Sequence, residues 1–127
     1  MSRYQDSNNL YYLGIRVDGN AIIKKKINGV YYTLTSKKIF PGTYNSLTNP
    51  NLLPHDLWIG LKARVVNENG FVRIQLYMDK DRTGTWTLIA ETLDNGAQGK
   101  PLLNEGYAGI RTDFMDVLFD DFQLIKK

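Results

Sequence analysis

Apolar and polar side chains alternate along most of this chain with the two-residue period of half-buried β-strands. The longest alternation spans residues 57–66, where Trp58, Lys62 and Arg64 fall on the polar side. No stretch of about twelve residues keeps the apolar spacing of a helix without a Gly, Pro or Asn. We therefore expect short strands at residues 10–17, 21–26, 30–35, 57–66, 71–79, 86–92, 107–112 and 114–125.

Turn signals separate these segments. Asn28-Gly29 and Asn69-Gly70 are typical of two-residue β-hairpins, and longer loops are expected at residues 40–56 and 94–105. Many short strands with frequent turns are typical of a sandwich or jelly roll. The predicted fold class is therefore all-β, an antiparallel β-sandwich formed by one domain over residues 1–127.

Composition narrows the classes of function. The 127 residues include no cysteine, which excludes disulfides and thiolate metal sites. The net charge of +3 reflects a small surplus of 16 Lys and Arg over 13 Asp and Glu, so we expect no nucleic-acid partner. No apolar run approaches the roughly 18 residues of a transmembrane helix, so we expect no membrane partner.

One heptapeptide pattern occurs twice. Residues 12–18 and 107–113 match at Tyr, Gly, Ile, Arg and Asp, and alternation places Tyr, Gly and Arg on one face of each strand. The glycine leaves a shallow dip between an aromatic ring and a planar bidentate donor. Two interpretations remain open: similar strands that pack on each other, or a ligand-binding face. The candidate ligand-binding residues are Tyr12, Arg16, Tyr107 and Arg111.

The charge run Lys24-Lys25-Lys26 does not form a single basic patch. Alternation sends Lys25 to the opposite face from Lys24 and Lys26. We expect a solvated strand beside a hairpin tip, where lysines also protect an exposed sheet edge from pairing.

Several motifs resemble the concanavalin A-like lectin/glucanase superfamily. They are the string RYQDSNNLYY at residues 3–12, the hairpin KKKING at 24–29, and the ending YAGIR at 107–111 with VLFDDF at 117–122. The similarity is closest to the LamG-like and keto-disaccharide-hydrolase-like branch, whose central strand usually opens with a Trp, as at Trp58 here. The resemblance implies a concanavalin-like jelly roll, with glycans on a concave face, and an extracellular location.

The resemblance and the Tyr/Arg pattern together predict a non-catalytic carbohydrate-binding, lectin-like domain whose partner is an oligo- or polysaccharide. Rings stack on pyranose faces, and guanidinium groups donate to hydroxyls or carboxylates. The alternatives are a fragment or subunit of a carbohydrate-active enzyme, either a glycoside hydrolase or a polysaccharide lyase, and a dimerising interaction domain. Further candidate ligand-binding residues are Arg3, Arg64 and Trp58.

Catalytic constellations are sparse. Hydrolases of the superfamily need paired carboxylates on one strand, whereas Glu68 is expected in a turn, Glu91 near a strand end and Glu105 in a loop. His55 is the sole histidine, is expected in a surface loop, and has no nucleophile elbow to serve. Lyase chemistry with a tyrosine base and an arginine remains open. An enzyme is therefore less favoured than a binding domain, and we predict no catalytic residue.

Two aspartate groups are candidate metal ligands. Asp79-x-Asp81-x-Thr83-Gly84 matches the start of a calcium loop, but Ala90 replaces the bidentate Glu, which favours a plain hairpin turn. Asp121 lies in the last predicted strand, near where related sandwiches bind a structural calcium. A structural calcium at Asp79, Asp81 or Asp121 is the sole cofactor considered.

The resemblance also predicts self-association. Domains of the superfamily usually carry several strands before the segment that here begins at Arg3. Either a minimal or a truncated sandwich would leave an open sheet edge or an uncovered core face. We therefore expect a homodimer.

Overall fold

Seven antiparallel β-strands build the part of the chain that the computed structural model describes, residues 1–113 and 115–126. No described residue lies in a helix, so no helix in these ranges could cross a membrane. The strands are β1 (Ser2–Asp6), β2 (Asn9–Ile15), β3 (Asn20–Ile27), β4 (Val30–Lys38), β5 (Ile59–Glu68), β6 (Phe71–Lys80) and β7 (Thr87–Asp94).

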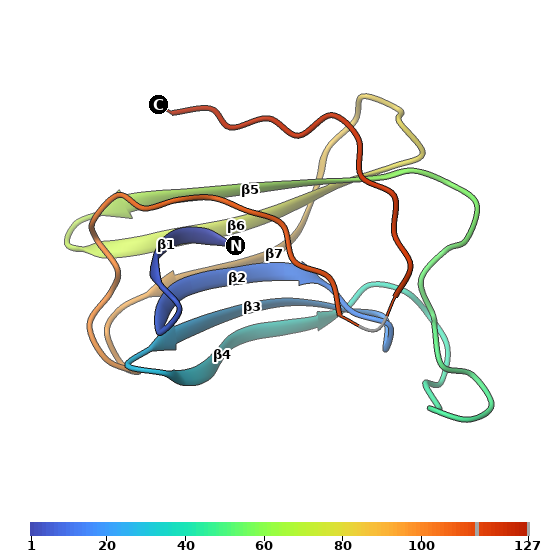
Figure 1. The fold of residues 1–127 in the computed structure, drawn as a ribbon, viewed down its shortest axis with the longest axis horizontal. Helices are drawn as coiled ribbons and strands as arrows, with labels where there is room; N and C mark the ends of the chain where they lie inside the picture. Colours follow the sequence, from blue (N-terminus) through green and yellow to red (C-terminus); the bar gives the residue numbers. More distant parts are fainter. Residues whose placement is uncertain (114, 127) are drawn as a thin grey trace.

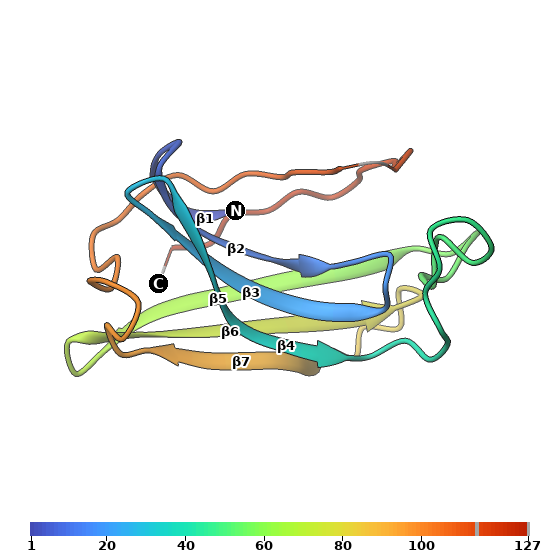
Figure 2. The same cartoon turned by 90° about the horizontal axis from the view of Figure 1, so that it is seen from below.

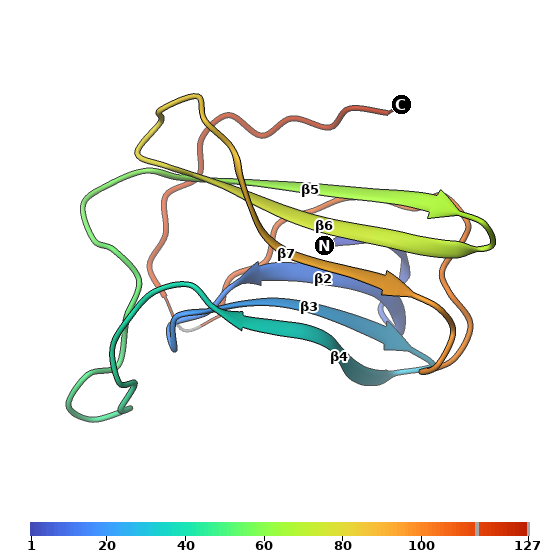
Figure 3. The same cartoon turned by 180° about the vertical axis from the view of Figure 1, so that it is seen from behind.

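The strands form two sheets, each made of consecutive strands. The first has the order β1-β2-β3-β4 and the second has the order β5-β6-β7 (Figures 1 and 3). The two-residue turns predicted at Asn28-Gly29 and Asn69-Gly70 are confirmed, because Ile27 pairs with Val30 and Glu68 with Phe71. Asn28 and Gly29 have φ values of 50° and 80°, as a type I′ turn requires. The connection 39–58 carries the chain from the first sheet to the second.

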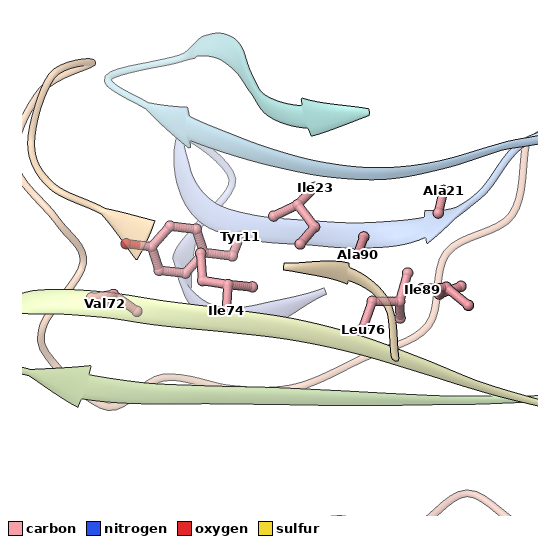
Figure 4. Packing of buried hydrophobic residues seen from close by; sticks show 8 residues of the cluster. All are labelled: Tyr11, Ala21, Ile23, Val72, Ile74, Leu76, Ile89 and Ala90. Carbon is pink, nitrogen blue, oxygen red and sulfur yellow. The ribbon is translucent and has the colours of Figure 1, made fainter. Parts of the chain in front are cut away.

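The core lies between the sheets, which gives the molecule a β-sandwich-like arrangement and confirms the all-β prediction. Figure 4 shows apolar side chains of both sheets pointing toward each other. In β6 they occupy alternating positions, as a half-buried strand requires, and Ile74 is fully buried. In β7 the adjacent Ile89 and Ala90 are both buried, where the register with β6 shifts. The cluster consists of Tyr11, Ala21, Ile23, Val72, Ile74, Leu76, Ile89 and Ala90.

A buried polar network crosses this core. The Lys25 ammonium lies 2.9 Å from an Asp94 carboxylate oxygen, and both side chains have no exposed surface. The Tyr11 hydroxyl donates a 2.6 Å hydrogen bond to Asp94 and accepts one of 3.0 Å from the Leu102 amide. Lys25 also donates to the Gly99 carbonyl at 2.8 Å. The network fixes the segment after β7 to the first sheet.

The position of Lys25 confirms one prediction from the sequence and contradicts another. Lys25 does point away from Lys24 and Lys26, but it is buried instead of solvated. The burial of a cation requires a hydrogen-bonded counterion, which Asp94 supplies. Burial, followed by the bond to Asp94, raises the pKa of the Tyr11 hydroxyl well above its usual value. No buried side-chain nitrogen or oxygen in the described ranges lacks a partner.

The two strands predicted at 107–112 and 114–125 are wrong for the described residues. Backbone pairing is limited to Tyr107 with Tyr4, at 2.9 and 3.0 Å, and to Gly109 with Met1. Residues 115–126 belong to no strand, and Phe114, where the last strand was expected to begin, lies outside the described residues. The edge of β1 explains this, because its register shifts between Ser2 and Asp6 and Arg3 has a φ of 47°. Such an edge offers few consecutive pairing sites.

Candidate functional site

The side of the four-stranded sheet that faces away from the core gathers aromatic and basic residues. Tyr12 of β2 pairs with Lys24 of β3, and Lys26 pairs with Tyr31 of β4. Their chain neighbours Tyr11 and Lys25 point into the core, so these four side chains point outward. We call Tyr12, Lys24, Lys26, Tyr31 and Arg111 the Tyr/Lys face.

Arg111 reaches this face from outside the sheet. The segment that carries it runs beside β1, at the edge of the four-stranded sheet (Figure 2), and pairs with Tyr4 through Tyr107. The Arg111 guanidinium carbon lies 5.6 Å from the centre of the Tyr12 ring, and Nη1 donates a 3.0 Å hydrogen bond to the Tyr31 hydroxyl. Nη2 pairs with Asp113 at 2.7 Å. One guanidinium therefore links two tyrosines that β3 separates.

Two ionisable groups are perturbed at this contact. Burial raises the pKa of the Tyr12 hydroxyl above its usual value, and the nearby Arg111 charge opposes this shift. The hydrogen bond to Tyr31, followed by the pairing with Asp113, raises the pKa of Arg111. Arg111 therefore remains a cation, and Tyr12 remains neutral at physiological pH.

The two lysines of the Tyr/Lys face converge on one ring. Lys26 Nζ lies 4.9 Å and Lys24 Nζ lies 5.9 Å from the centre of the Tyr31 ring. Neither lysine has a carboxylate within 4.0 Å among the described residues, whereas Arg111 is paired with Asp113. The face therefore carries two cations that form no ion pair within 4.0 Å among the described residues.

The structure brings together only part of the predicted Tyr/Arg site. Tyr12 and Arg111 meet, as the repeated heptapeptide suggested. Arg16 lies just beyond β2 and pairs with Asp18 at 3.6 Å. Tyr107 lies beyond β1, with 78% of its surface exposed. The Tyr12 ring lies beside Gly14, since a Cβ there would be 3.7 Å from the hydroxyl, so the ring partly fills the expected dip.

The other three candidate ligand-binding residues lie elsewhere. Arg3 donates to the Leu102 carbonyl at 2.8 Å and to Asn67, so it connects β1 with the second sheet. Arg64 is on β5 and donates to Gln75 at 3.1 Å. Trp58 precedes β5, and the guanidinium of Arg82 covers its ring at 4.5 Å.

The outer side of the three-stranded sheet also gathers rings and charges, and we call it the Trp/Lys face. Lys62 Nζ lies 4.8 Å from the centres of both the Tyr77 and the Trp86 rings. The Trp86 ring lies over Gly60, where an added Cβ would be 2.8 Å from a ring carbon. Gly60 thus leaves the room in which this tryptophan packs flat on the sheet.

The candidate calcium ligands are engaged in other contacts. The Asp79 carboxylate accepts hydrogen bonds from the Thr83 hydroxyl at 2.6 Å and from the amides of Thr83 and Gly84. These bonds, led by the hydroxyl, lower the pKa of Asp79. Asp81 is exposed with a φ of 73°, and Asp121 lies 4.0 Å from Arg82. Within residues 1–113 and 115–126 no three metal-ligating side chains cluster.

The glutamates form ion pairs. Glu68 and Glu91 both pair with Arg73, at 2.9 and 3.2 Å, and Glu105 pairs with Lys126 at 2.7 Å. Glu68 is the last residue of β5, just before the turn where it was expected; Glu91 lies within β7, and Glu105 lies in the following loop. His55 is exposed in the connection 39–58, as expected.

The sequence interpretation missed Tyr31, Lys24 and Lys26 as site residues. A signal was present, because a two-residue Asn28-Gly29 turn sets the hairpin register and therefore places Lys26 opposite Tyr31. The position of Arg111 had no such signal, since the segment that carries it leaves the sheet ladder after Gly109.

Comparisons with protein-family models, with curated proteins and with solved structures found no match for this chain. The geometry of the Tyr/Lys face is therefore the support for a function.

Proposed function

We propose that this chain is a non-catalytic carbohydrate-binding domain whose ligand lies on the Tyr/Lys face. The observation that carries the proposal is the Arg111 guanidinium, which contacts Tyr12 and Tyr31 on the outer side of the sheet. We further infer that the two sheets belong to a concanavalin-like jelly roll, which the order of the resembling motifs supports.

The chemistry of saccharides fits such a surface. The apolar face of a pyranose ring stacks on an aromatic ring, and its hydroxyls need donors of fixed geometry. Tyr31 is 42% exposed, which leaves part of its ring accessible. The guanidinium has five N–H donors, and it uses two of its nitrogens on Tyr31 and Asp113. Its remaining donors can bind hydroxyls.

A glycan panel with two arginine variants tests the proposal. Arg111→Ala removes charge-assisted hydrogen bonds worth about 1.5–3 kcal/mol, so affinity for any bound saccharide should fall at least tenfold. Arg64→Ala is the matched control, because this arginine contacts only Gln75 on the opposite sheet. Full affinity in the Arg111 variant, or no binding of any saccharide by the unaltered protein, would contradict the proposal.

A second candidate function is that of a dimerising interaction domain, which exposed apolar residues favour. Leu61 and Ala63 lie on the inner side of β5, opposite Met78 and Leu76 of β6, yet both are exposed. Leu118 and Leu124 in the C-terminal segment are 83% and 71% exposed. Apolar surface of this kind is typical of interfaces. We propose a second copy of the chain as the partner.

Light scattering at micromolar concentration tests this candidate. We expect the mass of two chains, and the mass of one chain for Leu61→Asp. Leu88→Asp is the control, since Leu88 is similarly exposed, at 42% against 44%, but points to the outer side. A single-chain mass for the unaltered protein, unchanged after tenfold concentration, would exclude the dimer.

A further inference from the structure

We infer that the glycan recognised by the Tyr/Lys face is acidic, and that Lys24 and Lys26 bind its carboxylate or sulfate groups beside the Tyr31 ring. This inference rests on the proposed function and adds the class of ligand. The observation behind it is the convergence of two ammonium groups on one exposed ring, at 4.9 and 5.9 Å from its centre.

The backbone places the two lysines as neighbours on one face of the sheet. Lys24 and Lys26 are two residues apart on β3, so they share one face with a separation of about 7 Å along the strand. The central position of β3 in the sheet, between β2 and β4, fixes that spacing. A ligand with anionic groups on successive sugar units can contact both lysines at once.

The balance of charge on the face also favours an anion. The arginines near Tyr12 have carboxylate partners, since Arg16 pairs with Asp18 and Arg111 pairs with Asp113. The two lysines have none within 4.0 Å in the part of the chain that the structure describes. A contact with the face of a ring leaves ammonium N–H groups free to donate to an oxyanion.

Neutral sugars should bind to this pair of lysines with lower affinity. A neutral hydroxyl gains only a modest hydrogen bond from an ammonium group, while the desolvation of that group is costly. A carboxylate or sulfate compensates for the desolvation by a charge-assisted bond. The same pair of lysines therefore favours acidic ligands and disfavours neutral ones.

Isothermal titration with defined oligosaccharides tests the inference. The ligands are an oligogalacturonate, a sulfated heparin oligosaccharide, a neutral gluco-oligosaccharide and a single-stranded DNA oligonucleotide, each in about 50 and 200 mM salt. We expect at least one of the two acidic saccharides to bind ten times more tightly than the neutral one. We expect its affinity to fall as the salt concentration rises. The galacturonate and heparin arms distinguish carboxylate from sulfate.

Variants locate the site. The double variant Lys24→Gln and Lys26→Gln should lose at least tenfold in affinity for the acidic saccharide and most of the salt dependence. Replacement of both lysines by arginine should retain binding. Lys62→Gln is the matched control, because Lys62 also lies over aromatic rings but on the opposite sheet, and it should bind normally. Circular dichroism verifies that each variant is folded.

The outcomes separate the two proposals. Equal binding of neutral and acidic saccharides, with no salt dependence, overturns the acidic ligand and leaves the carbohydrate-binding function in place. Binding that survives loss of Lys24 and Lys26 but not of Lys62 overturns the assigned position. Equal affinity for the DNA oligonucleotide overturns the glycan as the specific ligand. Failure of every saccharide to bind overturns both proposals.

Discussion

The two outer faces of the sandwich contain similar residues but arrange them differently. On the Trp/Lys face, Lys62 is shared by Tyr77 and Trp86, and Arg73 is paired with both Glu68 and Glu91. On that side one lysine is therefore shared by two rings, and one arginine is neutralised by two glutamates. Exposed aromatic and basic residues there are part of the structure's own packing.

The Tyr/Lys face keeps its charge available. Its arginine, Arg111, is paired with Asp113, whereas Lys24 and Lys26 contact the Tyr31 ring and have no carboxylate within 4.0 Å among the described residues. Both faces combine rings with lysine and arginine, and the difference is that two lysines meet at one ring on the Tyr/Lys face, whereas one lysine is shared by two rings on the Trp/Lys face. Two neighbouring cations at one exposed ring offer more to an anionic ligand than a single lysine shared by two rings.

The largest expected effect is a loss of saccharide affinity when a ring is removed from one face but not when a ring is removed from the other. Tyr31→Ala removes the stacking surface and the acceptor for Arg111, so binding of the preferred saccharide should weaken about thirtyfold, or ~2 kcal/mol. Tyr77→Ala removes the equivalent ring from the Trp/Lys face and should leave affinity unchanged. Titration calorimetry measures both. The reverse result would assign the ligand to the other sheet.

The next effect concerns the two glycines that lie beneath aromatic rings. Gly60→Ala places a Cβ 2.8 Å from the Trp86 ring, so the ring must move, and stability should fall by about 1–2 kcal/mol. Gly14→Ala meets only the Tyr12 hydroxyl region, at 3.7 Å, and should change stability by less than about 0.5 kcal/mol. Denaturant unfolding compares them. Equal losses would show that Trp86 is not packed against Gly60.

A smaller expected effect is a difference between the two faces in how the stability of the protein depends on pH. Hydrogen bonds lower the pKa of Asp79, and a hydrogen bond from Arg73 lowers that of Glu68. These carboxylates therefore stabilise the folded protein at pH values above their pKa in the unfolded chain, which is near 4. This stabilisation is lost as the pH falls through the lowered folded values. Asp79→Asn should therefore flatten the acid side of a plot of Tm against pH.

The alkaline side of the same plot reports on the Tyr/Lys face. The raised pKa of Tyr12 means that its stabilisation is complete below the unfolded value near 10 and is lost as the pH rises through the folded value. Tyr12→Phe should flatten the alkaline side in part, because Tyr11 also has a raised pKa. If Asp79→Asn flattened the alkaline side, or Tyr12→Phe the acid side, the corresponding pKa assignment would be wrong.

The smallest expected effect is no change at all. The only two tryptophans of the sequence are Trp58 and Trp86, and both lie at the second sheet. Saccharide binding to the Tyr/Lys face should therefore leave tryptophan fluorescence unaltered, while tyrosine absorbance changes. A large shift of tryptophan emission on binding would instead place the ligand on the Trp/Lys face.

Local patterns predicted most of the two sheets. Alternation and the Asn-Gly turns identified β2 to β7, because strand pairing between neighbours in the chain depends on residues a few positions apart. The same reasoning was wrong for the described residues of the range 107–125. Their alternation resembles that of a strand, but a strand also needs a neighbour with a regular free edge, and β1 has an irregular one. β1 itself was quoted only as part of the resemblance.

The candidate site was predictable to a smaller degree. Alternation told which side of a strand a residue takes, and this correctly separated Tyr12 from Tyr11 and Lys25 from its neighbours. It could not tell which sheet a strand joins, so Arg64 and Trp58 were grouped with residues of the opposite sheet. Which residues come together on one face depends on contacts between segments that are far apart in the sequence, and alternation within one strand does not report those contacts.

The buried network at Lys25 has a consequence for the order of folding. Each sheet is a meander of consecutive strands, so hairpin formation within a sheet needs only short loops to close and is fast. The bond from Tyr11 to Asp94 joins residues 83 apart, and that from Lys25 to Gly99 joins residues 74 apart. We expect these contacts to form late, when the finished sheets dock. Loss of the network should therefore speed unfolding far more than it slows folding.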